Sequence, residues 1–388
     1  MASDTQGQPS LPSSSHPPND SLHASLLPSL PFDLVVEILC RLPVKSLLEL
    51  RYVCKSWNSL ISDPKFAKKN LRYSLTDFTR HHLIVSNFSY YTRELSFTTY
   101  PLLSIFNVVA PAPAIQLEYP MGSYKRLDEI NGSCHGILCF SDDYSNFPFL
   151  WNPSTRRFKK LPPLENLPLK RSCYTIYGFG YDHFSDCYKV VAVFCYPSDN
   201  GGYKTQVNVY TLGTYSWRRI QEFPFEDVPK DPGKFVSGTI NWLSFDDSNW
   251  VVVSLDLEKE SYQKLNQPTT GYGKVNLTLG VLRDCLCIIS KYDTFFDVWL
   301  MKEYGNKESW SKLFTIRELG SSYAKILHMS ESEEVLLELK ENFVLYNFKN
   351  GTSKTAYIQM ELHMLEDDGS LMGSEVYVES LMSPCSLY

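Results

Sequence analysis

Residues 30–57 read LPFDLVVEILCRLPVKSLLELRYVCKSW, and the spacing of their apolar residues predicts helices. Pro31 and Pro43 each suit a first helical turn, because the N–H group that proline lacks would have no partner there. A short second turn carries Leu47 and Leu48. At 100° per residue, the apolar arc of the first helix consists of Leu34, Val35, Ile38, Leu39 and Leu42.

A third helix is predicted from Leu50 to Ile61, and Asp63-Pro64 ends it because the residue before a proline avoids the helical region. Its apolar stripe consists of Leu50, Val53, Cys54, Trp57, Leu60 and Ile61. A unit of about forty residues buries little surface, and this one has more apolar side chains than its own core can use. It reads as a docking module for the helices of another protein. The alternative is a helical cap that lies on the rest of the chain.

From about residue 80 the chain repeats a unit made of an apolar residue, a turn and an aromatic residue seven positions on. The copies are WNPSTRRF (151–158), YTLGTYSW (210–217), LDLEKESY (255–262), WLMKEYGNKESW with four residues inserted (299–310) and the weaker YNFKNGTS (346–353). Their starts lie 59, 45, 44 and 47 residues apart. A period in the mid-forties that is all strand and turn has the size of a four-stranded propeller blade.

The copy around Tyr210 shows all four strands of such a blade. They are YTIYGFGY, YKVVAVFCY, TQVNVYT and WRRI. RELSFTTY at 93–100 supplies the third strand of a first, degenerate blade. We therefore predict a mainly β chain with a small all-α N-terminal module, in which three helices precede a six-bladed propeller. A seventh blade would need another unit between residues 72 and 130. A β-sandwich also uses many short strands, but it gives no reason for a regular repeat.

The same patterns divide the chain into three parts. Residues 1–27 are rich in Ser and Pro and bury too little surface to offset their ordering entropy, so we expect a disordered tail. Residues 28–71 form the helical module and residues 72–388 the propeller. Trp217 and Trp310 end equivalent repeats, so each is expected to be a packing anchor between strands.

Composition limits the classes of partner and compartment. Lys plus Arg number 37 against 43 for Asp plus Glu, a formal net charge of −6, which predicts neither a nucleic-acid partner nor a membrane surface. No apolar run approaches the roughly 18 residues of a membrane helix. The first basic residue is Arg41, which does not fit a secretory signal. We expect a protein of the cytoplasm, the nucleus or both.

The sequence offers little for catalysis or metal binding. The ten cysteines include no CxxC pair, and none of the eight histidines stands at zinc spacing to a cysteine. Cys134 and His135 are adjacent in GSCHG (132–136), but neighbours on a strand point to opposite faces. A tight turn at His135-Gly136, with the histidine exposed, is the favoured reading. We expect no catalytic residue, metal or cofactor.

Residues 27–66, LPSLPFDLVVEILCRLPVKSLLELRYVCKSWNSLISDPKF, closely resemble the F-box motif of plant F-box proteins. The family often has a histidine where this chain has Asn70. The later part resembles the F-box-associated, kelch-like domain through GSCHGILCF, WNPSTRRFKKLPP, FGYDHFSDCYKVV, VYTLGTYSWRRI, GVLRDCLCI and DVWLMKEYGNKESWSKLF. Together the two resemblances cover about residues 28–380.

The resemblance implies a substrate-recognition subunit of an SCF-type cullin–RING ubiquitin ligase. The F-box would dock on a Skp-type adaptor, and through it on the cullin and the RING protein, while the β domain captures a target for ubiquitination. Such a receptor is not itself catalytic. The alternative is a propeller enzyme or lectin-like binder whose helices are a structural appendage.

Two sets of contact residues follow. The apolar arc and the family match together assign adaptor binding to Pro31, Leu34, Ile38, Leu39, Leu42, Pro43, Leu47, Leu48, Val53 and Trp57.

The second set lies in loops that join strands two and three of the predicted blades, where Asp recurs with aromatic residues. These residues are Asp142, Asp143, Tyr144, Asp199, Tyr203, Asp246, Asp247, Tyr292 and Asp293. Aromatics give contact area at low entropy cost and carboxylates steer a basic partner, so we predict a rim for a basic target protein. The competing explanation is that turns simply favour Asp and Asn. The basic run Arg156, Arg157, Lys159 and Lys160 is interpreted as a solvated turn.

Overall fold

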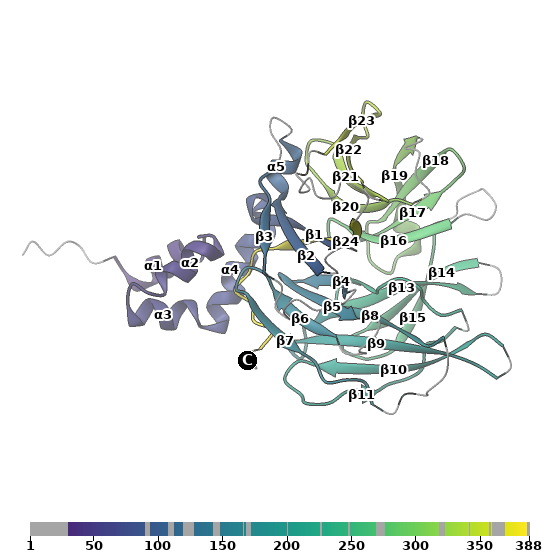
Figure 1. Cartoon of the computed structure of the whole chain (residues 1–388), viewed down its shortest axis with the longest axis horizontal. Coiled ribbons are helices and arrows are strands. Elements are labelled where there is room, and N and C mark those ends of the chain that lie inside the picture. Colours follow the sequence, from purple (N-terminus) through teal and green to yellow (C-terminus); the bar gives the residue numbers. More distant parts are fainter. Residues whose placement is uncertain are drawn as a thin grey trace, which may run out of the picture.

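The computed structural model contains an N-terminal group of helices joined to a ring of six four-stranded sheets (Figure 1). No helix in the described part of the chain has both the length and the apolar character needed to span a membrane. The structure describes residues 30–385 except 90–93, 108–111, 119–127, 143–147, 166, 168–171, 200, 226, 247–248, 269–275, 318–322, 341, 357 and 359–368. The predicted disordered tail, 1–27, lies outside the described residues.

Four helices precede the sheets, one more than predicted: α1 (Phe32–Leu39), α2 (Val44–Leu50), α3 (Lys55–Ile61) and α4 (Pro64–Thr76). The predicted third helix was wrong in its start, because Leu50 belongs to α2 and α3 begins only at Lys55. Asp63-Pro64 ends α3 as predicted but also starts α4. The carboxylate of Asp63 accepts a hydrogen bond from the backbone N–H of Lys65 at 2.6 Å, and Pro64 occupies the first turn.

Each sheet is one blade, whose strands follow one another from the centre of the ring outward. Blade 1 has β24 (Gly369–Val378), β1 (His81–Ser89), β2 (Glu94–Pro101) and β3 (Ile115–Leu117). Blade 2 has β4 (Asp128–Cys134), β5 (Ile137–Asp142), β6 (Phe149–Asn152) and β7 (Arg157–Lys160). Blade 3 has β8 (Tyr174–Asp182), β9 (Cys187–Pro197), β10 (Tyr203–Thr211) and β11 (Arg218–Arg219).

The remaining blades follow in chain order. Blade 4 has β12 (Lys234–Val236), β13 (Thr239–Asp246), β14 (Asn249–Asp256) and β15 (Tyr262–Asn266). Blade 5 has β16 (Asn276–Leu282), β17 (Cys285–Lys291), β18 (Phe295–Met301) and β19 (Trp310–Arg317). Blade 6 has β20 (Lys325–Met329), β21 (Glu334–Leu339), β22 (Asn342–Asn347) and β23 (Thr352–Thr355). A short helix, α5 (Leu102–Phe106), follows β2, and 3₁₀ turns span Phe78–Arg80 and Lys307–Ser309.

The ring closes between the two ends of the propeller sequence. β24 pairs antiparallel with β1, with Val378 opposite His81, so the last strand completes the first blade. The inner strands of the six blades neighbour one another around the centre. The six-bladed prediction is confirmed, and β2 is the third strand of blade 1, as predicted for residues 93–100.

The sequence repeat corresponds to one turn joining strands three and four. Asn152 Oδ1 accepts hydrogen bonds from the N–H groups two and three residues on, at 2.8 and 3.3 Å. Asp256 does the same at 2.9 and 2.9 Å, and Asn347 at 3.1 and 3.1 Å. A short side-chain acceptor can stabilise a tight turn in this way, so three repeats carry Asn or Asp directly after their first apolar residue.

The aromatic that ends the repeat links neighbouring blades. Trp217 Nε1 donates to the carbonyl of Pro162 at 2.8 Å, and Trp310 Nε1 to that of Asn266 at 2.9 Å. Each acceptor lies at or just beyond the end of the outer strand of the preceding blade. Both indoles are half-buried. A position on the outer strand leaves one side of the ring open to solvent.

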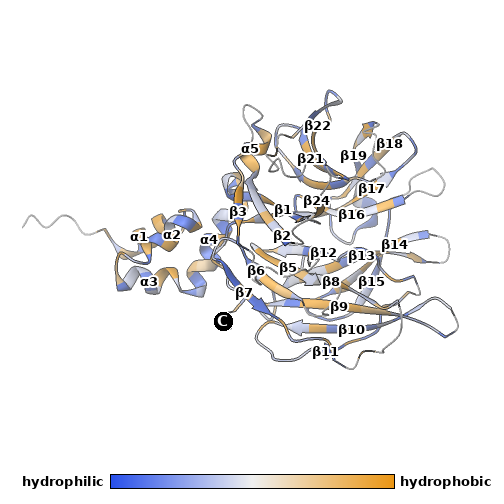
Figure 2. Ribbon diagram, viewed as in Figure 1, coloured by the Kyte–Doolittle hydropathy of each residue, from blue (hydrophilic) through white to orange (hydrophobic). Residues whose placement is uncertain are grey.

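The helices pack on the face of the ring formed by the turns between strands one and two. A single apolar core runs from α1, α2 and α4 to the turns of blades 2 and 3 and to the segment after β24. Lys68 on α4 pairs with Asp186 in the β8–β9 turn. Asn70 donates to the carbonyls of Cys40 at 2.9 Å and Leu42 at 3.1 Å. Figure 2 shows β9 to be hydrophobic along much of its length, whereas α1 to α3 alternate between hydrophobic and hydrophilic residues.

Candidate docking surfaces

The first candidate surface consists of apolar side chains that α1 leaves uncovered. Leu34 and Ile38 are 49% and 52% exposed and lie one turn apart on the same side of the helix. Phe32, at the start of α1, is also exposed. Large apolar side chains gathered on one helix indicate a surface that another molecule covers.

The turn between α2 and α3 adds to this surface. Tyr52 is 92% exposed and Val53 62% exposed. The sequence pattern identified Val53 but missed Tyr52 and Phe32. Tyr52 does not lie on the apolar stripe of the third helix as it was predicted. Phe32 lies just outside the predicted apolar arc of the first helix. Had a helix been predicted to end at Leu50, Tyr52 would have been predicted to lie in an exposed turn.

The predicted adaptor residues divide by burial. Pro31, Leu34, Ile38, Pro43 and Val53 are exposed, and Leu42, Leu48 and Trp57 are half-buried. Leu39 and Leu47 are only 2% and 0% exposed, so in this conformation neither side chain reaches a partner. Their prediction as surface contacts needs this correction, because both side chains belong to the apolar core that the helices share with blades 2 and 3.

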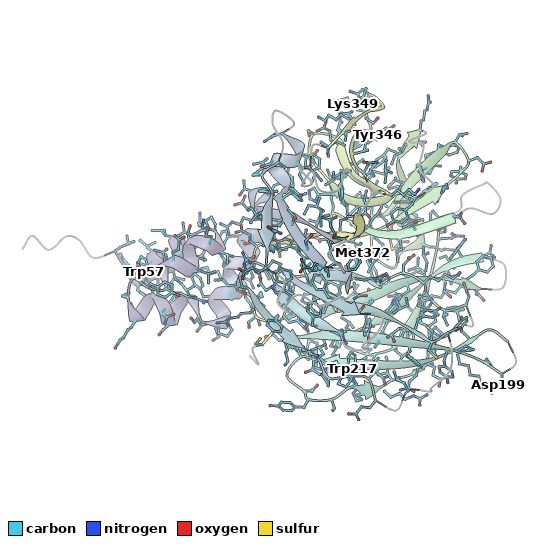
Figure 3. The ribbon with its side chains drawn as sticks, viewed as in Figure 1. Trp57, Asp199, Trp217, Tyr346, Lys349 and Met372 are labelled. Atoms are coloured by element: carbon cyan, nitrogen blue, oxygen red, sulfur yellow. The ribbon has the colours of Figure 1, made fainter. Side chains whose placement is uncertain are left out.

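The second candidate surface lies on the opposite face of the ring. Trp57 in the helices and Asp199 in the β9–β10 loop mark the two ends of the molecule (Figure 3). Asp199, Tyr203 and Asp293 are exposed there. Asp143, Tyr144 and Asp247 lie outside the described residues, and only the backbone of Asp142 is described, at the end of β5.

Several of the predicted target residues interact with other residues of the protein. Tyr203 packs edge-on against Tyr174, with ring centroids 5.6 Å apart. Asp246 forms an ion pair with Lys264, and Tyr292 is half-buried and stacks on Phe295 with ring centroids 4.4 Å apart. A paired carboxylate attracts a basic partner less strongly than an unpaired one. Asp199, Tyr203 and Asp293 are the predicted target residues whose side chains are exposed to solvent.

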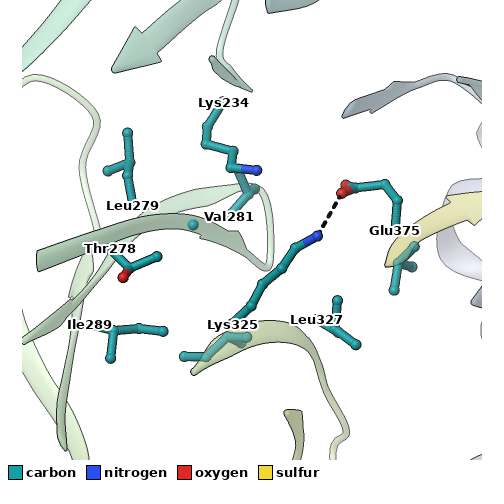
Figure 4. A pocket seen from close by; sticks show the side chains of 11 residues that line it. Lys234, Thr278, Leu279, Val281, Ile289, Lys325, Leu327 and Glu375 are labelled. Atoms are coloured by element: carbon teal, nitrogen blue, oxygen red, sulfur yellow. Dashed lines mark hydrogen bonds and ion pairs between the residues drawn. The ribbon is translucent and has the colours of Figure 1, made fainter. Parts of the chain in front are cut away.

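A pocket opens in the central channel between the two faces (Figure 4). Lys325 Nζ lies 3.4 Å from a carboxylate oxygen of Glu375, and Lys234 projects toward the same carboxylate. Burial lowers the pKa of Lys234, and the charge of Glu375 partly opposes this effect. The other lining side chains are largely aliphatic, and no hydroxyl or thiol nucleophile with an adjacent base is among them.

The GSCHG segment forms the predicted tight turn, but its histidine is not exposed. His135 and Gly136 have φ of 52° and 78°, and the imidazole packs edge-on against Tyr181 and Tyr188. Burial lowers the pKa of His135 to about 4. Burial likewise raises the pKa of the Cys134 thiol. A buried, protonated thiol is a poor nucleophile, so this pair does not form a catalytic site.

The described residues also contain no cluster of candidate metal ligands. No group of three or more His, Cys, Asp or Glu side chains within those ranges is arranged to hold an ion.

An exposed apolar helical module joined to a six-bladed propeller through a shared core defines a two-part class of interaction protein. A family model for the F-box domain matches residues 27–69, and one for the F-box associated beta propeller domain matches residues 102–383. The chain therefore belongs to the F-box proteins with an F-box-associated β-propeller domain.

Relatives with known names agree with this assignment. An F-box/kelch-repeat protein of Arabidopsis thaliana is 31% identical over 372 residues, which cover 92% of this chain and 97% of the relative. The F-box protein CPR1 of the same plant is 29% identical over 395 residues, covering 92% and 89%. Among solved structures, a chain of a nidogen/laminin complex gives a TM-score of 0.47 at 10% identity, covering 77% of this chain and 99% of that one.

Proposed function

We propose that this protein is a non-catalytic substrate receptor of a cullin–RING ubiquitin ligase of the SCF type. The F-box docks on a Skp-type adaptor, which connects it to the cullin and the RING protein, and the propeller captures a target for ubiquitination. The observation that carries the proposal is the exposed apolar surface of α1 and the α2–α3 turn within a segment that matches the F-box. The names of the relatives support a plant protein and a kelch-like propeller. We further propose that the protein works in the cytoplasm, the nucleus or both.

The fold supports a division of labour between the two faces. The F-box occupies one face of the ring, where its core is continuous with blades 2 and 3. The exposed Asp199, Tyr203 and Asp293 lie on the other face. A target held there would not compete with the adaptor for space. Because two of these side chains are carboxylates, we propose that the target presents a basic segment.

Adaptor binding is tested by replacing Leu34 and Ile38 together with Asp in the full chain. Two charges in an apolar contact should weaken binding of a purified Skp-type adaptor by about a hundredfold or more. The matched control is Leu103→Asp with Ile115→Asp. These residues are also an exposed Leu and an exposed Ile, but Leu103 lies in α5 and Ile115 in β3 of blade 1. Equal affinity for both double variants would contradict the proposal.

Target capture is tested separately by proximity labelling. The adaptor-binding double variant should accumulate its targets, because they are no longer ubiquitinated. Adding Asp199→Lys and Asp293→Lys should then remove the specific labelled proteins. Adaptor affinity of the charge-reversed chain, measured without the helix changes, serves as the folding control. Unchanged labelling would place the target site elsewhere on the propeller.

A further inference from the structure

One arginine of the helical module and one of the propeller lie close enough for their charges to interact. Arg51 caps the C-terminal end of α2, and Arg157 is the first residue of β7. Arg51 Nη2 donates to the carbonyl of Ile61 at 3.2 Å, whereas its Nε is enclosed and has no hydrogen-bond partner. Burial, and then the nearby charge of Arg157, lower the pKa of Arg51, and no carboxylate opposes them.

The arginines at this junction have, among the described residues, no nearby carboxylate of the kind that usually pairs with a surface arginine. Arg156 and Arg157 are both exposed, and neither has a carboxylate within ion-pairing distance in the described ranges of the chain. Other surface arginines differ: Arg218 reaches Glu260 at 2.5 Å and Arg219 reaches Glu222 at 2.8 Å. A guanidinium presents a planar fork of donors that fits a carboxylate. Guanidiniums without an ion-pair partner are available to bind acidic side chains of another molecule.

The turn that carries Arg156 and Arg157 is held firmly in place. Asn152 Oδ1 caps the turn from inside, and its Nδ2 donates to the carbonyls of Ser380 at 2.9 Å and Met382 at 2.7 Å. Asn152 is fully buried. The β6–β7 turn is therefore fixed to the segment that follows the ring-closing strand. A turn anchored on two sides presents its guanidiniums without losing much further entropy on binding.

The position of this surface identifies its partner. Arg51 directly precedes Tyr52 and Val53, which belong to the exposed apolar surface of the F-box. The β6–β7 turn, which carries Arg156 and Arg157, is bonded to the segment around Met382, and that segment shares a core with the helices. Asp199 lies at the other end of the molecule from Trp57 (Figure 3). A molecule that covers the F-box helices is therefore placed to reach these arginines as well.

We propose that Arg51, Arg156 and Arg157 form a basic seam that binds an acidic segment of the adaptor, beside the apolar contact on α1. This inference rests on the proposed function, because it assumes that an adaptor covers the F-box. The seam would fix the orientation of the propeller relative to the adaptor, since it engages a residue from each of the two domains. Apolar contacts on the helices would supply most of the affinity.

The test is Arg156→Glu with Arg157→Glu in the full chain, because Arg51 also holds the carbonyl of Ile61. The matched control is Lys204→Glu with Arg317→Glu, which changes the net charge equally at exposed positions on other blades. Binding of a purified Skp-type adaptor should weaken about threefold to tenfold at about 0.1 M salt for the seam variant, and not for the control. The difference should disappear near 1 M salt, where the Debye length falls to about 3 Å.

The outcomes distinguish failure of the seam proposal from failure of the proposed function. If the seam variant and its control bind the adaptor equally at low salt, while Leu34→Asp with Ile38→Asp abolishes binding, the seam proposal is overturned and adaptor docking stands. If none of the variants changes binding, both proposals fail. Thermal unfolding of each variant confirms that loss of binding does not reflect loss of the fold.

Discussion

The two domains differ in where they place their largest apolar side chains. The propeller encloses Trp151 and Trp242 almost completely, and its last strand pairs with its first so that no sheet is left unfinished. The F-box encloses Leu39 and Leu47 but leaves Leu34 and other large apolar residues in solvent. The F-box thus presents an apolar surface on its helices that, in our proposal, a partner covers.

This difference assigns a physical role to each domain. A closed ring keeps its shape while its loops vary, which suits recognition of different targets. An exposed apolar helix loses more accessible surface when it binds, and that burial drives association. The distinction can be tested by paired substitutions, one in each kind of environment.

The largest effect is expected inside the F-box. Leu47→Ala should destabilise the helical module by about 2–5 kcal/mol, because it opens a cavity in a small core. Leu34→Ala, on the exposed side of α1, should change stability by less than about 0.5 kcal/mol. Hydrogen–deuterium exchange of α1 to α3 measures both. Equal effects would mean that the helical module has no core of its own.

Ring closure provides the next comparison. Gly136 has a φ of 78°, and a Cβ there would lie 2.3 Å from the carbonyl oxygen of Val378 on β24. Gly136→Ala should cost about 2–4 kcal/mol, since backbone strain and a steric clash both oppose it. Gly201 has a φ of 86° with nothing within 4 Å of the added atom, so Gly201→Ala should cost only about 1 kcal/mol. Urea unfolding that gives both variants the same cost would contradict this packing of the closing strand.

A smaller effect is expected between blades. Trp217→Phe keeps most of the ring contact but removes the N–H that reaches Pro162, so it should cost about 0.5–1.5 kcal/mol. Trp310→Phe removes the equivalent bond to Asn266 and should cost the same. Tyr215, which is 90% exposed, is the aromatic control, and its replacement by Ala should leave stability unchanged. A tryptophan effect no larger than that of Tyr215 would show that the repeat does not link blades.

The smallest effect at neutral pH concerns His135, whose folded-state pKa is about 4 because it is buried. Its ordinary value is about 6.5, so the unfolded chain binds more protons between these limits. The contribution of His135 to stability is therefore fully present above pH 6.5 and is lost as the pH falls toward 4. An NMR titration of the imidazole should give a midpoint near 4. A midpoint near 6.5 would mean that the β4–β5 turn is open to solvent.

Periodicity predicted the propeller well, because blades 2 to 6 repeat the turn between strands three and four and the pattern survives local variation. Burial was harder to predict. Leu39 and Leu34 lie on one apolar arc, and only the packing of α4 and the blades decides which of them is enclosed. Asp63-Pro64 indicated a helix stop, but the following start was missed because a proline suits both positions. The meeting of Arg51 with Arg157 joins residues far apart in sequence, and no local pattern indicates it.

The central claim is that the exposed F-box surface, and not the propeller, is the principal contact with the adaptor. Hydrogen–deuterium exchange of the full chain with and without a purified Skp-type adaptor tests it most directly. We predict new protection in α1 and in residues 51–54, with blades 4 to 6 unchanged. Protection confined to the propeller, with α1 exchanging as in the free protein, would contradict the account.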